Sequence, residues 1–238
     1  MGSHAKFTTF NEAPLHAALK AWCRRPRDRV EAPVDGFVVD LVRGKRLIEI
    51  QTGNFSGLRR KLEALLPRHP VHVVYPVEAQ KWLVKLPRKK GEMPTRRKSP
   101  KRGRVEHVFR ELVSLAHLVP EANFSLQVVL AHVEEARRYD GKRGWRRGGW
   151  VTHERRLLEV VGQHTFKCPA DYLALLPKIL EEPFTTAELA AAWAAPRWLA
   201  HKGAYCLHRM SALTRDGKRG NAWRYRRAKS PLPRGKAG

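Results

Sequence analysis

Cysteine is scarce in this sequence, and long apolar segments are lacking. The three cysteines, Cys23, Cys168 and Cys206, lie far apart, so neither a disulfide framework nor a cysteine-based zinc site is indicated. No apolar stretch is long enough for a transmembrane helix, no basic amphipathic anchor for a membrane surface is present, and no secretory signal is recognisable. We therefore expect a cytoplasmic, nucleoid-associated protein that does not bind membranes.

Acidic residues are also few. The 238 residues include 22 Asp and Glu against 47 Lys and Arg, which gives a net charge of +25. This excess is spread along the chain, and it repels itself unless it meets a polyanion. Nucleic acid is the expected partner, and double-stranded or branched DNA is favoured. An RNA-binding or ribosome-associated protein is the alternative, and a homodimer is a further partner to test.

Several common enzyme signatures are absent as well. The sequence has no Gly-rich phosphate loop, serine nucleophile pattern or dinucleotide fingerprint. His69 and His72 have no Cys or carboxylate at metal-binding spacing, so we expect structural roles for them. The hydrophobic content of 42% is nevertheless enough for a folded core, and the length is typical of one large or two small domains.

The most informative stretch lies between residues 37 and 62. Two short apolar segments, 37–42 and 47–50, flank the sequence Arg-Gly-Lys-Arg, and this pattern predicts a β-hairpin. The amphipathic spacing of Leu58, Leu62 and Leu65 predicts a helix after it. The segment thus predicts two antiparallel strands followed by a helix that covers one face of their sheet.

Two carboxylates, Asp40 and Glu49, interrupt the apolar residues of this hairpin. With a turn of two or four residues, Asp40 faces Leu47 and Val38 faces Glu49, so the two carboxylates lie diagonally on one face, with Gln51 on the face of Glu49. A turn of three residues would place the carboxylates on opposite faces. Like charges at close range require a cation, and two carboxylates with a backbone carbonyl indicate Mg²⁺ or Mn²⁺.

The succession of Asp40, then Glu49-Ile50-Gln51, then a helix resembles the PD-(D/E)XK nuclease superfamily. The core of that superfamily is a helix, three antiparallel strands, a helix and a strand, and the resemblance covers residues 11–77. It implies that Asp40 and Glu49 are metal ligands, with help from the Ile50 carbonyl. The superfamily normally has Lys where this chain has Gln51, which carries no charge. Lys61 on the following helix is the residue that would supply the charge, and without it the site would bind DNA but not cut it.

Two other acidic residues are accessory candidates. The superfamily often places a glutamate on the first helix, predicted here over residues 11–23, and Glu12 is at that position. Its alternative role is a favourable interaction with the helix dipole. Asp35 is the second candidate for the catalytic aspartate, but the pair Asp35-Gly36 is also typical of a turn.

Two basic segments, 87–104 and 141–150, contain almost no apolar residues other than tryptophan. We predict that both are flexible loops that contact phosphates, and that the tryptophans of the second stack on bases or else anchor a surface turn. A solvated linker is the alternative for the first segment. The residues expected to contact DNA are Arg96, Arg97, Lys98, Lys101, Arg102, Arg146 and Arg147. Further strands are predicted over 30–36, 71–76, 124–133 and 157–166, and helices over 105–118 and 169–176.

The last quarter of the chain is different in character. Thr185 and Glu188 form a capping box before an Ala-rich helix, and a second helix (196–210) and a strand (222–227) follow. This order is similar to a winged helix-turn-helix over residues 183–228. The resemblance implies that the second helix, with Arg197 and Lys202, enters a major groove, and that Lys218 and Arg219 of the wing contact phosphates or the minor groove. A winged helix that binds proteins is the alternative.

Together these observations predict an α/β fold in two domains. Residues 1–180 are expected to form a restriction-endonuclease-like αβββαβ core with a mixed sheet, and residues 181–238 a small winged helix-turn-helix domain. The expected function is metal-dependent hydrolysis of phosphodiester bonds in DNA. The alternative is a catalytically inactive nuclease fold that binds DNA or regulates another process.

Overall fold

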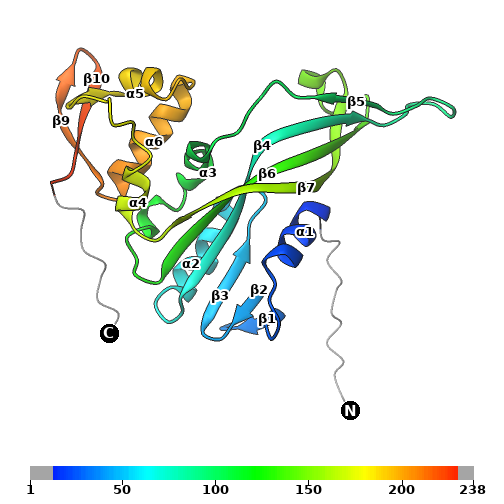
Figure 1. The fold of residues 1–238 in the computed structure, drawn as a ribbon, viewed down its shortest axis with the longest axis horizontal. Helices are drawn as coiled ribbons and strands as arrows, with labels where there is room; N and C mark the ends of the chain where they lie inside the picture. The colour runs from blue at the N-terminus through cyan, green and yellow to red at the C-terminus, as the bar shows by residue number, and fades with distance from the viewer. Residues whose placement is uncertain (1–12, 230–238) are drawn as a thin grey trace.

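The computed structural model of the protein describes residues 13–229, and its largest feature is a mixed β-sheet (Figure 1). The strands occur in the order β1-β2-β3-β4-β6-β7, with β5 paired to β4. They are β1 (Arg29–Val34), β2 (Phe37–Arg43), β3 (Arg46–Ile50), β4 (Val71–Lys85), β5 (Thr95–Lys98), β6 (Phe124–Tyr139) and β7 (Trp150–Phe166). The fold is therefore α/β with a large mixed sheet, as the sequence predicted.

The first part of the sheet is a meander of three antiparallel strands, β1, β2 and β3, after which β3 and β4 pair in parallel. The crossover between β3 and β4 consists of η1 (Phe55–Leu58) and α2 (Arg59–Leu65). The β1–β2 turn is Asp35-Gly36, and both residues have positive φ, which is the geometry of a tight hairpin turn. Asp35 is thus a turn residue.

Helices cover both faces of the sheet. On one face, α1 (Pro14–Cys23) buries Leu15 and Leu19 against residues that include Ile48 and Ile50. On the other face lie α2 and a segment that was predicted as one helix over 105–118. That segment consists of three short turns instead, η2 (Val105–Val108), α3 (Phe109–Leu112) and η3 (Ala116–Leu118). The predicted first helix is confirmed from Pro14 onward, whereas Asn11 and Glu12 lie outside the described residues.

The C-terminal part forms a separate three-stranded sheet with the order β8-β10-β9. Its elements are α4 (Pro169–Leu173), β8 (Phe184–Thr185), α5 (Thr186–Ala192), α6 (Arg197–Arg209), β9 (Leu213–Arg219) and β10 (Ala222–Arg227). The predicted capping box is present, because the Thr185 amide donates to Glu188 Oε2 at 2.7 Å and the Thr185 hydroxyl accepts from the Glu188 amide. This bond pattern fixes the start of α5.

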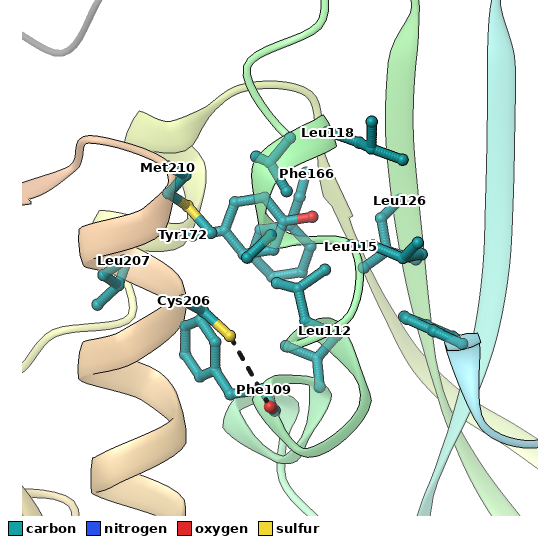
Figure 2. Close-up of a cluster of buried hydrophobic side chains, with 14 of the residues drawn as sticks. Phe109, Leu112, Leu115, Leu118, Leu126, Phe166, Tyr172, Cys206, Leu207 and Met210 are labelled. Carbon is teal, nitrogen blue, oxygen red and sulfur yellow. Dashed lines mark hydrogen bonds between the residues drawn. The ribbon is translucent and has the colours of Figure 1, made fainter. Parts of the chain in front are cut away.

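One hydrophobic cluster joins the C-terminal part to the large sheet, so the core is continuous across residue 180. Figure 2 shows Phe109 of α3 beside Cys206 of α6, whose Sγ lies 4.0 Å from the Phe109 carbonyl oxygen. The rings of Phe109 and Trp193 stack with centroids 5.8 Å apart. These contacts hold α6 against α3.

Strands β4, β6 and β7 are longer than predicted and continue past the helices as an arm (Figure 1). Their pairing continues to Lys85 opposite Arg137 and to Tyr139 opposite Trp150. The basic segment 87–104 was predicted to be a flexible loop, but part of it is β5, which pairs with β4. Buried Ser99 accepts a hydrogen bond from Gln80 through its carbonyl, at 2.9 Å. Within residues 13–229, no helix has the length and apolar character needed to cross a membrane.

Candidate functional site

The hairpin of β2 and β3 places Asp40 and Glu49 just beyond its last backbone pair, where Asp40 contacts His16 of α1 and Glu49 contacts Lys61 of α2, the helices on the two faces of the sheet. Its turn is Gly44-Lys45, and the ladder runs from Arg43 opposite Arg46 to Leu41 opposite Ile48. Asp40 and Glu49 are the next residues beyond this last pair. The turn has two residues, as one of the expected cases required, but the register differs from the expected one by two residues. Leu47 is therefore opposite Val42 and not opposite Asp40.

Asp40 is held by groups on both sides. Its Oδ2 accepts a hydrogen bond from the Ile50 amide at 2.8 Å and lies 3.3 Å from Nε2 of His16 on α1. Burial raises the pKa of Asp40, but the hydrogen bonds from His16 and Ile50 outweigh burial and leave the pKa below its usual value. Asp40 is therefore a carboxylate at neutral pH, and α1 and β3 fix its position.

Glu49 has a different environment. It is only 5% exposed, and burial raises the pKa of Glu49 to about 7, with Lys61 acting against this shift and the charge of Asp40 adding to it. Nζ of Lys61 lies 2.5 Å from Oε1 of Glu49 and also donates to the Val38 carbonyl at 2.6 Å. The site thus has one firmly ionised carboxylate and one that titrates near neutrality beside an ammonium group.

The remaining predicted site residues lie farther from this pair or outside the described chain. The side chain of Gln51 donates to the Asn54 carbonyl at 2.7 Å, so it is turned toward the loop that precedes η1. Asp35, at the β1–β2 turn, contacts Nε2 of His69 at 2.9 Å and forms no part of the Asp40–Glu49 pair. Glu12 lies outside the described residues.

The donor set at this pair is compatible with a hard divalent cation. Between residues 13 and 229, no group of three or more His, Cys, Asp and Glu side chains is placed to hold a metal ion. Mg²⁺, however, is usually held by one or two carboxylates together with waters and substrate phosphates. Oε1 of Glu49 is buried and lies 2.5 Å from the Lys61 ammonium, so a cation bound at this pair would share the Glu49 carboxylate with Lys61. Asp40 and Glu49 would hold the ion, and the Ile50 carbonyl remains the proposed third donor.

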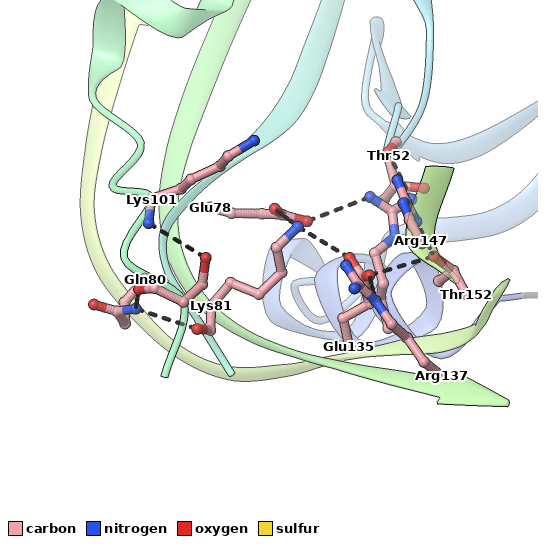
Figure 3. Close-up of polar contacts among 11 residues, drawn as sticks. Thr52, Glu78, Gln80, Lys81, Lys101, Glu135, Arg137, Arg147 and Thr152 are labelled. Atoms are coloured by element: carbon pink, nitrogen blue, oxygen red, sulfur yellow. Dashed lines mark hydrogen bonds and ion pairs between the residues drawn. The ribbon is translucent and has the colours of Figure 1, made fainter. Parts of the chain in front are cut away.

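A network of charged residues at the base of the arm lies beside the loop that follows β3 (Figure 3). Arg155 of β7 donates to the Thr52 carbonyl at 3.1 Å and lies 3.6 Å from Glu78 of β4. Buried Glu135 contacts Lys81 at 2.9 Å and Arg137 at 2.6 Å. This network was not predicted from the sequence, although the charges of Glu134-Glu135 directly after an apolar strand were the available signal.

Most basic residues predicted to contact DNA are exposed on the arm. Arg97, Lys101 and Arg102 are exposed and form no ion pair within the described part of the chain. Arg96 instead pairs with Glu134 at 2.8 Å and, like Lys98, lies over the Trp82 ring.

In the 141–150 segment the two tryptophans differ. Trp145, next to Arg146 and Arg147, is 79% exposed, whereas Trp150 packs edge-on against Tyr139. One tryptophan therefore anchors the turn, and the other is available for stacking.

The C-terminal candidates are distributed differently from the prediction. Arg197 is exposed at the start of α6, but Lys202 donates to the Arg110 carbonyl at 2.8 Å and so faces α3. Lys218 and Arg219 lie in β9 and not in the hairpin turn: Lys218 lies over Trp223, and Arg219 contacts Glu188 at 2.5 Å. The exposed face of α6 has four residues at intervals of four, only the first of which was predicted to contact DNA: Arg197, His201, Tyr205 and Arg209.

Comparisons with known proteins found relatives without an assigned function. The family model described as "Domain of unknown function (DUF8091)" matches residues 13–167. An "Uncharacterized protein" of Treponema pallidum (strain Nichols) is 30% identical over 226 residues, which cover 92% of this chain and 86% of the relative. No solved structure matches the chain. The range matched by the family model contains Asp40, Glu49 and Lys61.

Proposed function

The chain belongs to the DUF8091 family, and we propose that it is a DNA-binding protein that hydrolyses phosphodiester bonds with the help of Mg²⁺ or Mn²⁺. The observation that carries this proposal is the meeting of Asp40, Glu49 and Lys61, which come from two strands and a helix. The order of elements over residues 14–85 supports it, because it is a helix, three antiparallel strands, a helix and a parallel strand. This order is the one that the resemblance to PD-(D/E)XK nucleases implies.

Each residue of the site has a defined part in the proposed reaction. Asp40, which stays ionised, and Glu49 would hold the cation, and His16 fixes the Asp40 carboxylate. The chemistry supplied by a bound divalent cation would be activation of water as a nucleophile and polarisation of the phosphate. Lys61 stabilises the negative charge that develops on the phosphate oxygens in the transition state. In this proposal Lys61 takes over the charge that Gln51 lacks.

The basic surfaces supply the affinity for DNA in this proposal. Arg97, Lys101 and Arg102 on the arm are free to neutralise phosphates, and Trp145 is free to stack on a base. The exposed face of α6 carries Arg197, and in a winged helix-turn-helix domain this face would lie in the major groove. The order of helix, strand, two helices and hairpin over residues 169–227 supports that assignment.

The experiment is a cleavage assay on plasmid, linear and branched DNA with and without Mg²⁺ or Mn²⁺. We expect cleavage that requires the cation and is lost in Glu49→Gln and Asp40→Asn. Glu63→Gln is the matched control, because Glu63 is exposed on α2 and pairs with Arg59 outside the site. Cleavage that persists in Glu49→Gln, or that needs no divalent cation, would contradict the proposal.

A second function is favoured by one observation, the hydrogen bond that turns the Gln51 side chain toward Asn54. With no charged residue at that position, the chain would bind DNA without cutting it. A salt-sensitive gel shift with no cleavage of any substrate would indicate this inactive, regulatory form. Competition between duplex DNA and structured RNA would show whether the preferred polyanion is DNA.

A further inference from the structure

A cavity of about 760 Å³ lies on the sheet face that α1 covers, next to the C-terminal end of α1. Apolar Ile48 and Val74 line it together with neutral polar side chains of the central strands, which we call its floor: His72 of β4, Ser125 and Gln127 of β6, and Gln163 and Thr165 of β7. Asp40 and Glu49 do not line it, so the cavity is separate from the candidate catalytic pair. Its size is in the range of small-molecule binding sites in proteins.

The rim of this cavity is strongly basic. Among residues 13–229, five cationic side chains and no Asp or Glu line it: Arg24, Arg25, Arg43, Arg46 and Lys167. Arg43 is held in place by Asp28, whose two oxygens accept hydrogen bonds at 3.0 and 2.7 Å. The other four form no ion pair with a carboxylate in the described range. Their charge is therefore available to an anionic ligand.

The positive charges at the rim act on His72, a residue of the floor. Burial lowers the pKa of His72, a hydrogen bond to Gln127 acts against this, and the charges of Arg46, Arg43 and Lys167 lower the pKa further. His72 therefore stays neutral, with its ring nitrogens 2.9 Å from Ser125 Oγ and 3.2 Å from Gln127 Oε1. Gln127 in turn donates to Gln163 at 2.7 Å. The floor is a connected set of neutral donors and acceptors beneath several cations.

An aromatic side chain completes the lining. Trp22, in the last turn of α1, is 42% exposed although it is the largest side chain on its helix. An exposed tryptophan offers a stacking surface to a planar ring, and neutral amides and hydroxyls offer hydrogen bonds to the edge of that ring. Cations at the rim offer charge-assisted hydrogen bonds to phosphate oxygens.

We propose that this cavity binds a nucleotide, with the phosphate at Arg46 and Lys167 and the base between Trp22 and the polar floor. The nucleotide is either free in solution or the terminal residue of a strand. This site is independent of the proposed nuclease, because its residues are not those that would hold the metal.

The test is isothermal titration of the full chain with deoxyadenosine 5′-monophosphate, deoxyadenosine and inorganic phosphate as separate probes. We expect saturable binding of the monophosphate, at least about tenfold tighter than either fragment, since each fragment lacks one half of the contacts. The double variant Arg46→Gln/Lys167→Gln should weaken binding at least about tenfold, since it removes two charge-assisted contacts. The double variant Asp40→Asn/Glu49→Gln should bind as the wild type does, whatever its effect on DNA cleavage.

Two further variants separate the parts of the site. Lys178→Gln is the matched control, because Lys178 is exposed and does not line this cavity, and it should leave nucleotide binding unchanged. Trp22→Ala should weaken the monophosphate but not inorganic phosphate. A 5′-phosphorylated oligonucleotide that binds tighter than the monophosphate would identify the end of a strand as the ligand, and the reverse would identify a free nucleotide.

Three outcomes would overturn the proposal. They are the absence of saturable binding, an equal loss in Lys178→Gln, and inorganic phosphate binding as tightly as the monophosphate. Urea unfolding of each variant must show the wild-type midpoint, because only a folded variant tests the cavity.

Discussion

Nζ of Lys61 lies 2.5 Å from Oε1 of Glu49. Helix α2 thus supplies the positively charged side chain that is missing at position 51, where the chain has Gln. For the proposed nuclease, Lys61→Met should lower the cleavage rate about 100-fold, because it removes a positive charge beside the reacting phosphate. Lys61→Arg should restore part of the rate. Gel-shift affinity should stay near that of the wild type in both variants, and equal cleavage by Lys61→Met and the wild type would contradict the assigned role.

Glu49 should make stability depend on pH in an unusual direction. Its pKa in the folded chain is about 7, above the ordinary value of 4.5, so the folded state binds more protons than the unfolded state between these values. Stability should therefore fall as pH rises through this range, by about 3 kcal/mol for this group. The pKa of Asp40 is lowered, so Asp40 stays ionised throughout this range and contributes no slope.

The measurement is urea unfolding of the wild type and Glu49→Gln at several pH values from 4.5 to 8. As pH rises, the wild type should lose stability relative to Glu49→Gln. The free energy of unfolding of the wild type minus that of the variant should therefore decrease, through zero if the variant becomes the more stable protein. Contributions from histidines cancel in this comparison. A difference that is the same at every pH would mean that the pKa of Glu49 is not raised.

Divalent cations should stabilise the chain through the same pair. At 100 times its dissociation constant, a ligand that binds only the folded state adds about 2.7 kcal/mol to the free energy of unfolding. We expect Mg²⁺ or Mn²⁺ to raise the melting temperature at pH 8, and to raise it less in Asp40→Asn and Glu49→Gln. Glu63→Gln, which alters an exposed carboxylate on α2, should respond as the wild type does.

Gly203 is where the close packing of α6 can be tested. A Cβ at this position would lie 2.6 and 2.8 Å from ring atoms of Trp193, which is buried and anchored by a 2.9 Å hydrogen bond to the Leu175 carbonyl. Gly203→Ala should therefore lower the free energy of unfolding by about 1–3 kcal/mol. Gly57→Ala, where a Cβ meets nothing within 4 Å, should change it by less than about 0.5 kcal/mol. Equal unfolding midpoints for the two variants would contradict this packing.

The salt dependence of DNA binding should report the contacts of the arm. If Arg97, Lys101 and Arg102 each neutralise one phosphate, replacing all three by Gln should reduce the slope of log affinity against log salt by up to about 2.7. The control is Arg68→Gln/Lys178→Gln, which removes exposed charges away from the arm. A fluorescence titration at several salt concentrations gives both slopes, and identical slopes would show that the arm does not contact phosphates.

Local patterns in the sequence predicted much of the fold. Alternation and turn chemistry predicted the hairpin with Asp40 and Glu49, and the Thr185–Glu188 spacing predicted the start of α5. These features depend on residues a few positions apart. The exact hairpin register was wrong by two residues, because Arg-Gly-Lys-Arg permits more than one placement of a two-residue turn.

Features that depend on distant residues were not predictable in this way. Strands β4 and β6 continue through charged sequence because Lys81 of one contacts Glu135 of the other, and this pairing has no local signal. Strand β5 has no apolar residue, and it forms because the edge of β4 offers it backbone partners. The cavity beside α1 likewise arises where segments about 50 residues apart meet, such as those containing His72 and Ser125.

The contact of Cys206 in α6 with Phe109 in α3 has a geometric consequence for the proposed nuclease. Because α6 packs into the same hydrophobic core as the large sheet, its exposed side and the Asp40–Glu49 carboxylates would stay at one separation. A duplex gripped by this helix would then present the same phosphate to the acidic pair each time. The spacing between the gripped sequence and the scissile bond would be constant from one substrate to the next.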